Sequence, residues 1–247
     1  MSVYTSLIEF YHKQNAGYWV LLDPDKLPIE KLSGFMDLLI NSEVDAILIG
    51  GSLILTSDFE HFVGEVKKYS KNIPVILFPG SVHQVTTKAD AILFLSVISG
   101  REAQNLIGNQ VLAAPLVYRS GLEAISTAYM LIDSGRQTAA QFMSGSLPLP
   151  RNKADLVVAH ALAAQYLGFK LIYLECGSGA DLSVPDEIIS SVRKTVDLPI
   201  IVGGGITSPD IAAKKVAAGA TFIVTGNVLE KSDDPHLIRD FSAAVHP

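Results

Sequence analysis

Short apolar runs recur along the chain, and each is followed by a polar or glycine-rich turn. Eight runs are expected to form strands, at residues 18–22, 46–49, 75–78, 91–95, 111–117, 171–174, 198–202 and 221–224. The runs are almost continuously apolar rather than alternating, which is typical of parallel strands covered on both faces. The pattern therefore predicts a parallel sheet enclosed by helices.

The segments between the runs place apolar residues at helical spacing. Helices are expected at residues 6–13, 29–40, 59–69, 152–167, 208–219 and 235–245. Residues 79–90 are too few for a full helix with its connections, and residues 118–150 are expected to form a long excursion. Strands alternating with helices predict an α/β fold, a modified (β/α)8 barrel in which a loop replaces the helix between strands three and four. An open doubly wound sheet is the alternative, but it would not need eight repeats.

Length and composition narrow the class of protein. The chain has 247 residues and no linker-like segment, so we expect residues 1–247 to form one barrel domain. Hydrophobic residues make up 49% of the chain, enough for a core and for a groove or subunit interface. The net charge of −6 argues against a nucleic-acid partner. A single cysteine suits a reducing cytoplasm, and no apolar stretch reaches the roughly 20 residues that span a bilayer.

Glycine-rich turns follow the last three apolar runs, at residues 175–180, 203–206 and 225–227. Such turns expose backbone N–H groups that bind anions. Loops after the last strands are also where (β/α)8 barrels commonly hold a phosphate. We therefore expect a small phosphorylated substrate.

Two turns nearer the amino terminus carry groups that bind a metal. Asp23 and Asp25 follow the first run, and Ser52 ends a Gly-Gly-Ser turn after the second. Mg²⁺ is usually bound by one or two carboxylates together with substrate phosphates. Asp23 is the better ligand candidate, with Asp25 capping the next helix and Ser52 adding a hydroxyl. Ordinary turns are the alternative for both segments.

Tyr173 and Glu175 are two residues apart, so their side chains leave the sixth strand on the same face. Burying a carboxylate without a partner is costly, which favours a polyol or metal beside Glu175. Tyr173 fits core packing equally well. Cys176 has no nearby histidine or second cysteine in the sequence and is interpreted as a packing residue. Arg101 and Arg119 follow predicted strands, but solvent-facing charges explain them better.

Five ordered motifs resemble those of geranylgeranylglyceryl phosphate synthases and their bacterial heptaprenylglyceryl phosphate relatives. They are LLDPDK (21–26), GGS (50–52), YLECGSGA (173–180), VGGGI (202–206) and TGN (225–227). YLECGSGA is the most specific and is similar to the second group of the family, although Cys176 stands where alanine is common. VGGGI alone occurs in many phosphate-binding barrels.

The resemblance implies a prenyltransferase that joins sn-glycerol 1-phosphate to a long-chain prenyl diphosphate through an ether bond and releases diphosphate. It implies a Mg²⁺ cofactor held by Asp23 and Ser52, with Glu175 and Tyr173 as catalytic residues. The substrate-binding residues that it implies are Tyr173, Leu174, Glu175, Cys176, Gly177, Ser178, Gly179, Gly204, Gly205, Gly226 and Asn227. It further implies a cytoplasmic homo-oligomer, a dimer or hexamer, that contacts the membrane surface transiently.

A prenyl chain requires an apolar groove. Its candidates are Phe94, Leu95, Val97, Ile98, Tyr118, Tyr129 and Met130. Geranylgeranyl diphosphate is the favoured donor, and a heptaprenyl donor is the alternative within the family. Outside the family, the phosphate loops alone would also fit a sugar-phosphate isomerase or aldolase, or a barrel that binds phosphate without catalysis.

Overall fold

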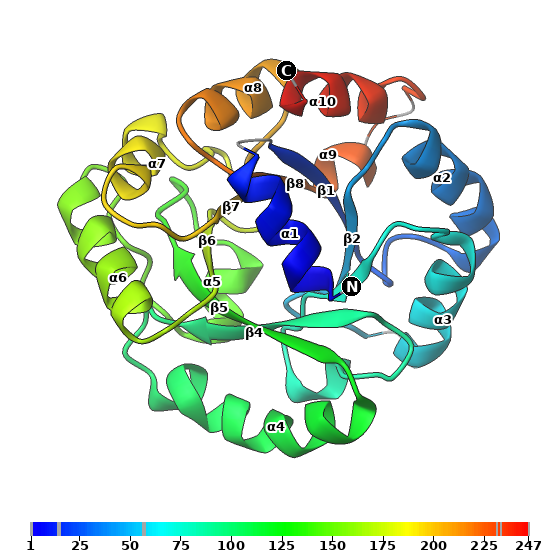
Figure 1. The fold of residues 1–247 in the computed structure, drawn as a ribbon, viewed down its shortest axis with the longest axis horizontal. Coiled ribbons are helices and arrows are strands. Elements are labelled where there is room, and N and C mark those ends of the chain that lie inside the picture. The colour runs from blue at the N-terminus through cyan, green and yellow to red at the C-terminus, as the bar shows by residue number, and fades with distance from the viewer. Residues whose placement is uncertain (1, 14–15, 56–57, 231, 233, 247) are drawn as a thin grey trace.

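Eight parallel strands close into one barrel in the computed structural model, which describes residues 2–13, 16–55, 58–230, 232 and 234–246 (Figure 1). The strands are β1 (Gly17–Leu22), β2 (Ala46–Ile49), β3 (Val75–Leu77), β4 (Ala91–Val97), β5 (Glu123–Leu131), β6 (Leu171–Glu175), β7 (Ile200–Gly203) and β8 (Phe222–Thr225). Each strand pairs with the next in sequence, and β8 pairs with β1. The predicted (β/α)8 barrel is therefore confirmed.

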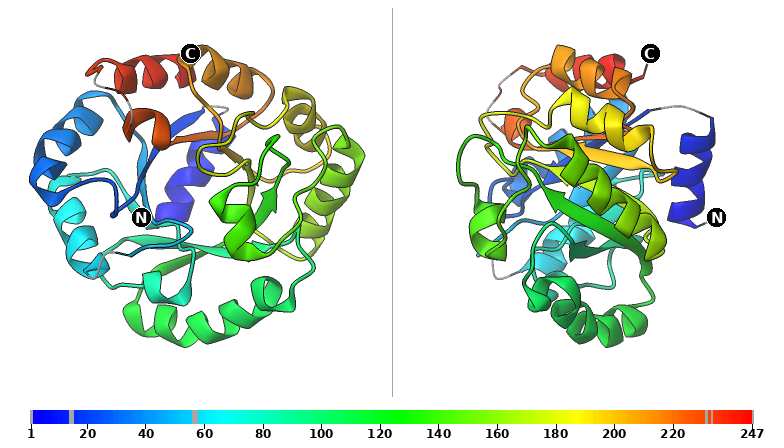
Figure 2. Two further views of the ribbon diagram at one scale, coloured as in Figure 1. Left: turned by 180° about the vertical axis from the view of Figure 1, so that it is seen from behind. Right: turned by 90° about the vertical axis from the view of Figure 1, so that its left-hand side faces the viewer.

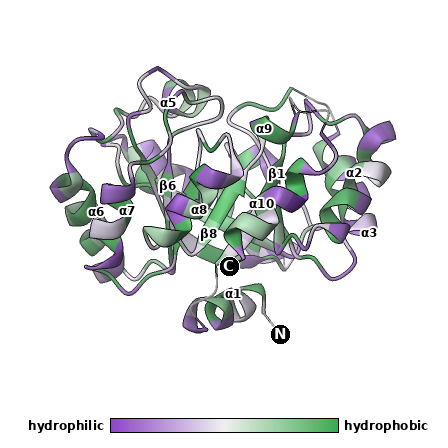
Figure 3. Ribbon diagram, turned by 90° about the horizontal axis from the view of Figure 1, so that it is seen from above, coloured by the Kyte–Doolittle hydropathy of each residue, from purple (hydrophilic) through white to green (hydrophobic). Residues whose placement is uncertain are grey.

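Helices surround this barrel and cover one of its ends. The main helices are α1 (Val3–His12), α2 (Ile29–Asn41), α3 (Phe59–Tyr69), α4 (Asn109–Ser120), α5 (Ala139–Ser144), α6 (Ala154–Tyr166), α7 (Asp186–Arg193), α8 (Pro209–Ala217), α9 (Asn227–Glu230) and α10 (Leu237–Val245). Figure 2 shows α1 lying across the amino ends of the strands, and Figure 3 shows α5 and α9 on the opposite side. The carboxyl ends of the strands are thus left to short helices and loops. In the described part of the chain, no helix is long and apolar enough to cross a membrane.

The predicted fifth strand is wrong. Residues 111–117 lie in α4, which follows a π-helical turn at Gln104–Gly108, and the fifth strand is β5, inside the predicted excursion. A short apolar run does not distinguish a buried strand from a helix by periodicity. Pro115, within the run, argued against a central strand because proline cannot donate a ladder hydrogen bond. The true strand escaped notice because Ser126 and Thr127 interrupt its apolar pattern.

The expected loss of a helix between strands three and four is confirmed. Only a three-residue 3₁₀ turn, η1 (Val82–Gln84), lies between β3 and β4. Here β3 and β4 share two registered residue pairs, whereas β4 and β5 share seven, Ala91↔Glu123 to Val97↔Tyr129. The barrel wall is therefore least extensively paired where the helix is missing.

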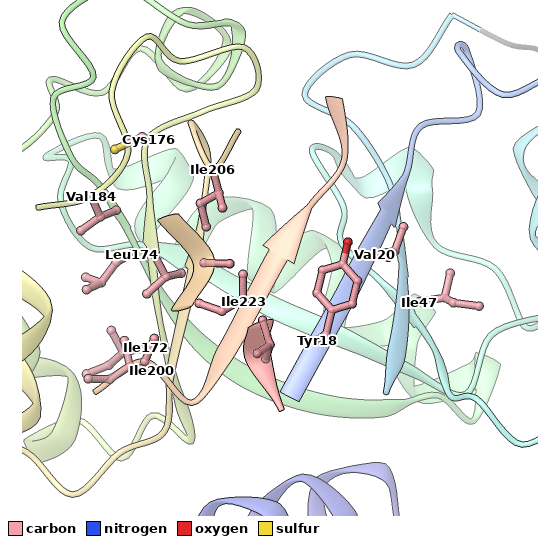
Figure 4. Close-up of a cluster of buried hydrophobic side chains, with 14 of the residues drawn as sticks. Tyr18, Val20, Ile47, Ile172, Leu174, Cys176, Val184, Ile200, Ile206 and Ile223 are labelled. Atoms are coloured by element: carbon pink, nitrogen blue, oxygen red, sulfur yellow. The ribbon is translucent and has the colours of Figure 1, made fainter. Parts of the chain in front are cut away.

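Strand alternation separates two apolar layers. One lies inside the barrel and includes Trp19 and Phe222, which stack at 4.4 Å between ring centroids. The other lies between strands and helices; Figure 4 shows Leu174 and Cys176 within it. Side chains at 173 and 175 consequently share one face, as the sequence predicted, and that face is the inside of the barrel.

Carboxylates at the amino end of the barrel are paired with backbone N–H groups. Glu123 accepts from the N–H groups of Val3 (2.6 Å) and Tyr4 (3.2 Å) and so anchors α1. Asp45 accepts from Tyr18 N (2.7 Å) and contacts His246 Nε2 (2.8 Å).

Asp90 is paired in the same way. It accepts from Val75 N (2.8 Å) and from Lys67 Nζ (2.8 Å). Each of these carboxylates therefore ties a strand start to a neighbouring element.

Candidate active site

A cleft of about 850 Å³ opens at the carboxyl ends of the strands. It has a polar end, formed by the loops after β1, β2, β6, β7 and β8, and an apolar arm along β4 and α5, which α4 borders with Asn109, Gln110 and Ala113. Loops dominate the polar end because each strand stops at a turn rich in glycine or aspartate. Loops from the start of the sequence, after β1 and β2, and loops from its end, after β6, β7 and β8, therefore line the same cleft.

Glu175 lies at the centre of the polar end and is only 6% exposed. Its Oε1 accepts a hydrogen bond from Gly177 N at 2.5 Å. Burial raises the pKa of Glu175 to about 7, although the Gly177 N–H favours the ionised form. A carboxyl with a pKa near neutrality can accept or release a proton under physiological conditions.

Tyr173 lies beside Glu175 and is fully buried. Its hydroxyl lies against the Glu175 carboxylate, close enough to lower the pKa of Glu175, but it makes no hydrogen bond of good geometry with the described residues. Burial and the neighbouring Glu175 charge raise the pKa of Tyr173 well above its ordinary value, so the hydroxyl stays protonated. A buried hydroxyl without a partner is costly, and a ligand in the cleft would satisfy it.

Glycine is required where the loops after β6 and β7 meet. Gly204 has φ +78°, and a Cβ there would collide with the Glu175 carboxylate and lie 2.6 Å from Gly177 N. Gly177 has φ +93°, and a Cβ there would collide with Thr138, in the segment before α5. The glycines let three loops approach closely, so backbone N–H groups can face a ligand.

The β6 loop is also tied to the loop after β8. Ser178 Oγ and Asn227 Oδ1 are 2.6 Å apart, and both residues line the cleft with Gly226. A Cβ on Gly179 would lie 3.6 Å from Asn227 Nδ2 and 3.2 Å from Arg136 Nη2. Donors from β6, β8 and the segment before α5 therefore converge on one side of the cleft.

Asp23 lies in the loop after β1, which is next to the β8 loop because β1 pairs with β8. Its Oδ2 contacts Lys26 Nζ at 3.0 Å, and its Oδ1 accepts from Asp25 N at 3.1 Å. A Cβ on Gly51 would lie 3.7 Å from the Asp23 carboxylate, so the Gly51–Ser52 loop faces it. Asp25 does not cap α2 as expected; its carboxylate accepts from Leu55 N at 2.7 Å.

Gln84 holds the loop that carries Ser52. Its side chain is buried, and its Nε2 donates to Gly51 O at 2.9 Å. Its Oε1 accepts from Gly80 N at 3.0 Å and from Gly51 N at 3.4 Å. The turn that replaces the missing helix thus fixes the loops after β2 and β3 to each other.

The donor set suits a hard cation with few protein ligands. No cluster of three or more His, Cys, Asp or Glu side chains that could hold a metal occurs in the described ranges. Asp23 provides one carboxylate, and the Ser52 hydroxyl lies in the same cleft. Such a set fits Mg²⁺, which often keeps waters and takes further oxygens from substrate phosphates.

Three aromatic rings form the floor between the polar end and the apolar arm. Phe78 and Tyr173 stack with centroids 5.0 Å apart and planes 1° apart. Tyr129, from β5, lies 5.5 Å from Tyr173 and 6.0 Å from Phe78. Such a floor can pack against an apolar chain and attract a cation through its ring faces.

The apolar arm contains part of the predicted groove. Its lining includes the predicted residues Phe94, Leu95, Val97 and Tyr129. Ala139, Ala140 and Met143 close the arm from the α5 side.

The other predicted groove residues lie elsewhere. Met130 and Ile98 pack in the outer layer, and Tyr118 on α4 is 87% exposed. Alternation along β5 explains why Met130 faces the outer layer while its neighbour Tyr129 lines the cleft.

The model of one protein family, the PcrB family, matches residues 10–245. The chain belongs to the PcrB family.

Relatives in this family include named enzymes. The chain is 44% identical over 246 residues to the geranylgeranylglyceryl phosphate synthase of Spirosoma linguale, covering 98% of each. It is 42% identical over 244 residues to the corresponding enzyme of Chitinophaga pinensis, covering 99% of this chain and 96% of that one. The family resemblance stated from the motifs is therefore confirmed.

A solved structure extends the comparison to three dimensions. The structure of (S)-3-O-geranylgeranylglyceryl phosphate synthase from Thermoplasma acidophilum, in complex with its substrate sn-glycerol-1-phosphate, matches with a TM-score of 0.91. The two sequences are 30% identical, and the match covers 100% of this chain and 99% of that one. The PcrB-family chain thus shares the whole barrel with that enzyme.

Most of the predicted site residues of this PcrB-family chain lie around one cleft. The predicted residues that line it are Asp23, Ser52, Tyr173, Glu175, Gly177, Ser178, Gly179, Gly204, Gly205, Gly226 and Asn227. The side chains of Leu174 and Cys176 instead point into the outer apolar layer. The backbone of Cys176 pairs with β7, since its N–H donates to Gly203 O at 3.2 Å.

The sequence pattern did not indicate three residues of this site: Lys26 and Arg136, which line the cleft, and Gln84, which fixes one of its loops. Lys26 stood inside the LLDPDK motif and was a signal that could have been used. Gln84 and Arg136 follow β3 and β5 within irregular segments, where spacing carries little information. Arg101 binds the carbonyls of Ser99 and Gly100 rather than lining the cleft, and Arg119 is exposed.

Proposed function

We propose that the protein joins sn-glycerol 1-phosphate to geranylgeranyl diphosphate, forming an ether and releasing diphosphate. The observation that carries this proposal is the two-part cleft, in which phosphate-type loops and Glu175 adjoin an apolar arm. The identities to named geranylgeranylglyceryl phosphate synthases support the same reaction. A sugar-phosphate isomerase or aldolase would not need the apolar arm.

The glycerol phosphate occupies the polar end in this proposal. Its phosphate is bound by backbone N–H groups at Gly204, Gly205, Gly226 and Asn227, in loops whose glycines admit an anion. Its hydroxyls then lie near Glu175 and the unpartnered hydroxyl of Tyr173. Holding the acceptor in this orientation removes much of the entropic barrier to attack on the allylic carbon.

Glu175 takes up the proton that the attacking hydroxyl loses. Its pKa of about 7 makes it a base near neutral pH, and its contact with Gly177 N fixes the orientation of the carboxylate. In this proposal the allylic end of the donor lies beside the aromatic floor of Phe78, Tyr129 and Tyr173, which favours its developing positive charge.

The diphosphate end of the donor lies near Asp23 and Ser52. These residues would hold Mg²⁺, which stabilises the negative charge that grows on a leaving diphosphate when it is bound. Gln84 keeps Ser52 in place by fixing its loop. The isoprenoid chain extends along Phe94, Leu95 and Val97.

We also propose that the rim of the cleft contacts a membrane surface transiently, because the donor is a lipid. Leu53 and Met143 line the cleft and are 55% and 50% exposed. Flotation with phosphatidylcholine vesicles tests this contact, and no co-flotation would contradict it. A cytoplasmic homo-oligomer, a dimer or hexamer, completes the proposal and is tested by light scattering.

A turnover assay tests the reaction. Purified protein is incubated with radiolabelled sn-glycerol 1-phosphate, MgCl₂ and prenyl diphosphates of several lengths, and products are separated by chromatography. Geranylgeranylglyceryl phosphate is the expected product. Formation of only the heptaprenyl product would correct the donor. The absence of product with every donor, from folded protein that binds the glycerol phosphate, would refute the transferase.

A further inference from the structure

Lys26 lies at the junction of the two anion-binding regions of the cleft. The turn after β1 brings it back over Asp23, since Lys26 N donates to Asp23 O at 3.0 Å. Its Nζ contacts Asp23 Oδ2 at 3.0 Å, Glu230 Oε2 at 3.2 Å and Asn227 Oδ1 at 3.3 Å. An ammonium group has three donors, and here three acceptors surround it.

These contacts cross the closure of the barrel. Asp23 and Lys26 follow β1, whereas Asn227 and Glu230 form α9 after β8. Asn227 Oδ1 also contacts Ser178 Oγ after β6, at 2.6 Å. The Lys26 ammonium group therefore connects Asp23, the carboxylate suited to a metal, with the loops suited to a phosphate.

Charge in this part of the cleft is scarce. Among the described residues that line it, the cationic side chains are Lys26 and Arg136, against Asp23, Glu175, Asp181 and Glu230. Arg136 already contacts Asp181 at 3.4 Å. Without Lys26, the Asp23 carboxylate would lose its ion pair and present a negative charge beside the loops that receive an anion.

We propose that Lys26 exchanges its partners when ligands bind. In the free protein it neutralises Asp23. It releases the Asp23 carboxylate when a divalent cation binds there, and it then donates to the substrate phosphate. The proposal rests on the proposed function for the identity of the two ligands. Lys26 is suited to the exchange because its side chain is 41% exposed and can turn from the carboxylates toward a ligand.

The exchange predicts that removing Lys26 weakens phosphate binding and tightens divalent-cation binding. A lysine that only stabilised the fold would not change the two affinities in opposite directions. In Lys26→Met, inorganic phosphate should bind roughly tenfold more weakly, because a charge-assisted hydrogen bond is lost. Mn²⁺, measured without phosphate, should bind roughly threefold to tenfold more tightly, because a competing cation is gone. Both affinities are measured by calorimetry and need no turnover.

Matched variants complete the experiment. Lys26→Arg keeps the charge and should restore phosphate affinity to within roughly threefold of wild type. Lys67→Met removes a lysine–aspartate pair at the other end of the barrel and should change neither affinity. If Lys26→Met does not fold, Glu230→Gln provides the test, since removing a competing carboxylate should tighten phosphate binding.

Two results would overturn the proposal. Weaker binding of both phosphate and Mn²⁺ would show that Lys26 only stabilises the fold of the site. Unchanged phosphate binding would show that Lys26 does not contact the anion. Because these titrations use no prenyl donor, failure of prenyl transfer in wild type would be a separate result. The expected opposite shifts would then still establish the exchange.

Discussion

At the amino end of the barrel, Glu123, Asp45 and Asp90 each accept hydrogen bonds from backbone N–H groups, and the last two also pair with a cationic or ionisable side chain. At the carboxyl end, Glu175 is more deeply buried but has no cation among its hydrogen-bond partners. Tyr173 beside it has no partner for its hydroxyl among the described residues.

The difference shows how one barrel separates stability from chemistry. A carboxylate paired with N–H donors and a cation lowers the energy of the folded chain, whereas the burial of Glu175 without a cation raises it and leaves bonding capacity for a ligand. Substitutions at the amino end should therefore reduce stability without affecting turnover. Substitutions at Glu175 and Tyr173 should do the reverse.

The largest expected effect is on the turnover of Glu175→Gln. Glutamine keeps the shape and the acceptor for Gly177 N but cannot take a proton. Prenyl transfer should fall about 10²–10⁴-fold. In wild type, kcat should rise with pH through about 7, the pKa of Glu175. Steady-state kinetics from pH 5.5 to 9 measure both, and an unchanged kcat in the variant would contradict the role.

The same residue should make stability depend on pH in the opposite direction. The pKa of Glu175 rises from 4.5 to about 7 on folding, so the native state binds more protons between these values. The free energy of unfolding therefore falls as pH rises through this window. Urea titrations at pH 5 and pH 8 should show this loss in wild type and a smaller loss in Glu175→Gln.

At the amino end, Asp90→Ala should destabilise the protein by about 2 kcal/mol, since Val75 N loses its carboxylate partner. Turnover of the remaining folded protein should stay within twofold of wild type. Urea unfolding and the transfer assay measure the two quantities on one preparation. Reduced turnover in fully folded Asp90→Ala would show that the two ends are not separable.

Tyr173→Phe should have a smaller effect on stability and the opposite sign. Removing a buried hydroxyl without a partner should leave the free energy of unfolding unchanged or raise it by up to about 1 kcal/mol. Transfer should nevertheless slow, because the glycerol loses a contact. Tyr129→Phe, in the neighbouring ring, is the matched control. A destabilised Tyr173→Phe would mean that the hydroxyl serves the fold.

The smallest expected effect concerns His246. Its hydrogen bond to Asp45 raises the pKa of His246, although partial burial opposes the rise. A raised pKa gives stability that is present below the unfolded value and lost as pH rises through the folded one. His246→Asn should therefore cost about 0.5 kcal/mol at pH 5.5 and less at pH 9. Thermal melts at both pH values measure this loss of stability. An equal loss at both pH values would show that the charge of His246 does not contribute.

The sequence predicted the barrel and most of the polar end because both depend on local signals. Apolar runs followed by glycine turns located seven of the eight strands, and residue alternation placed Tyr173 and Glu175 correctly. Alternation also implies that Leu174 and Cys176 face outward. The resemblance of the YLECGSGA motif nevertheless assigned both residues to the substrate site.

Apolar runs alone did not indicate the fifth strand or the bridging residues. The apolar pattern of residues 111–117 fits either structure, and Pro115 was the local signal against a central strand. Gln84 bonds to backbone groups of Gly51 and Gly80. Gly51 is distant from it in sequence, and a backbone group leaves no signal in the sequence. Lys26 meets Asn227 and Glu230 only because the barrel closes.

The short seam between β3 and β4 has a consequence for how the barrel opens. With two registered pairs there and seven between β4 and β5, local unfolding costs least along this line. Amide exchange by partial opening should therefore begin at β3 rather than be spread evenly around the wall. Phe78, which follows β3, stacks on Tyr173, so each such fluctuation would loosen the floor of the cleft. The missing helix thereby makes the cleft the most easily deformed part of an otherwise continuous wall.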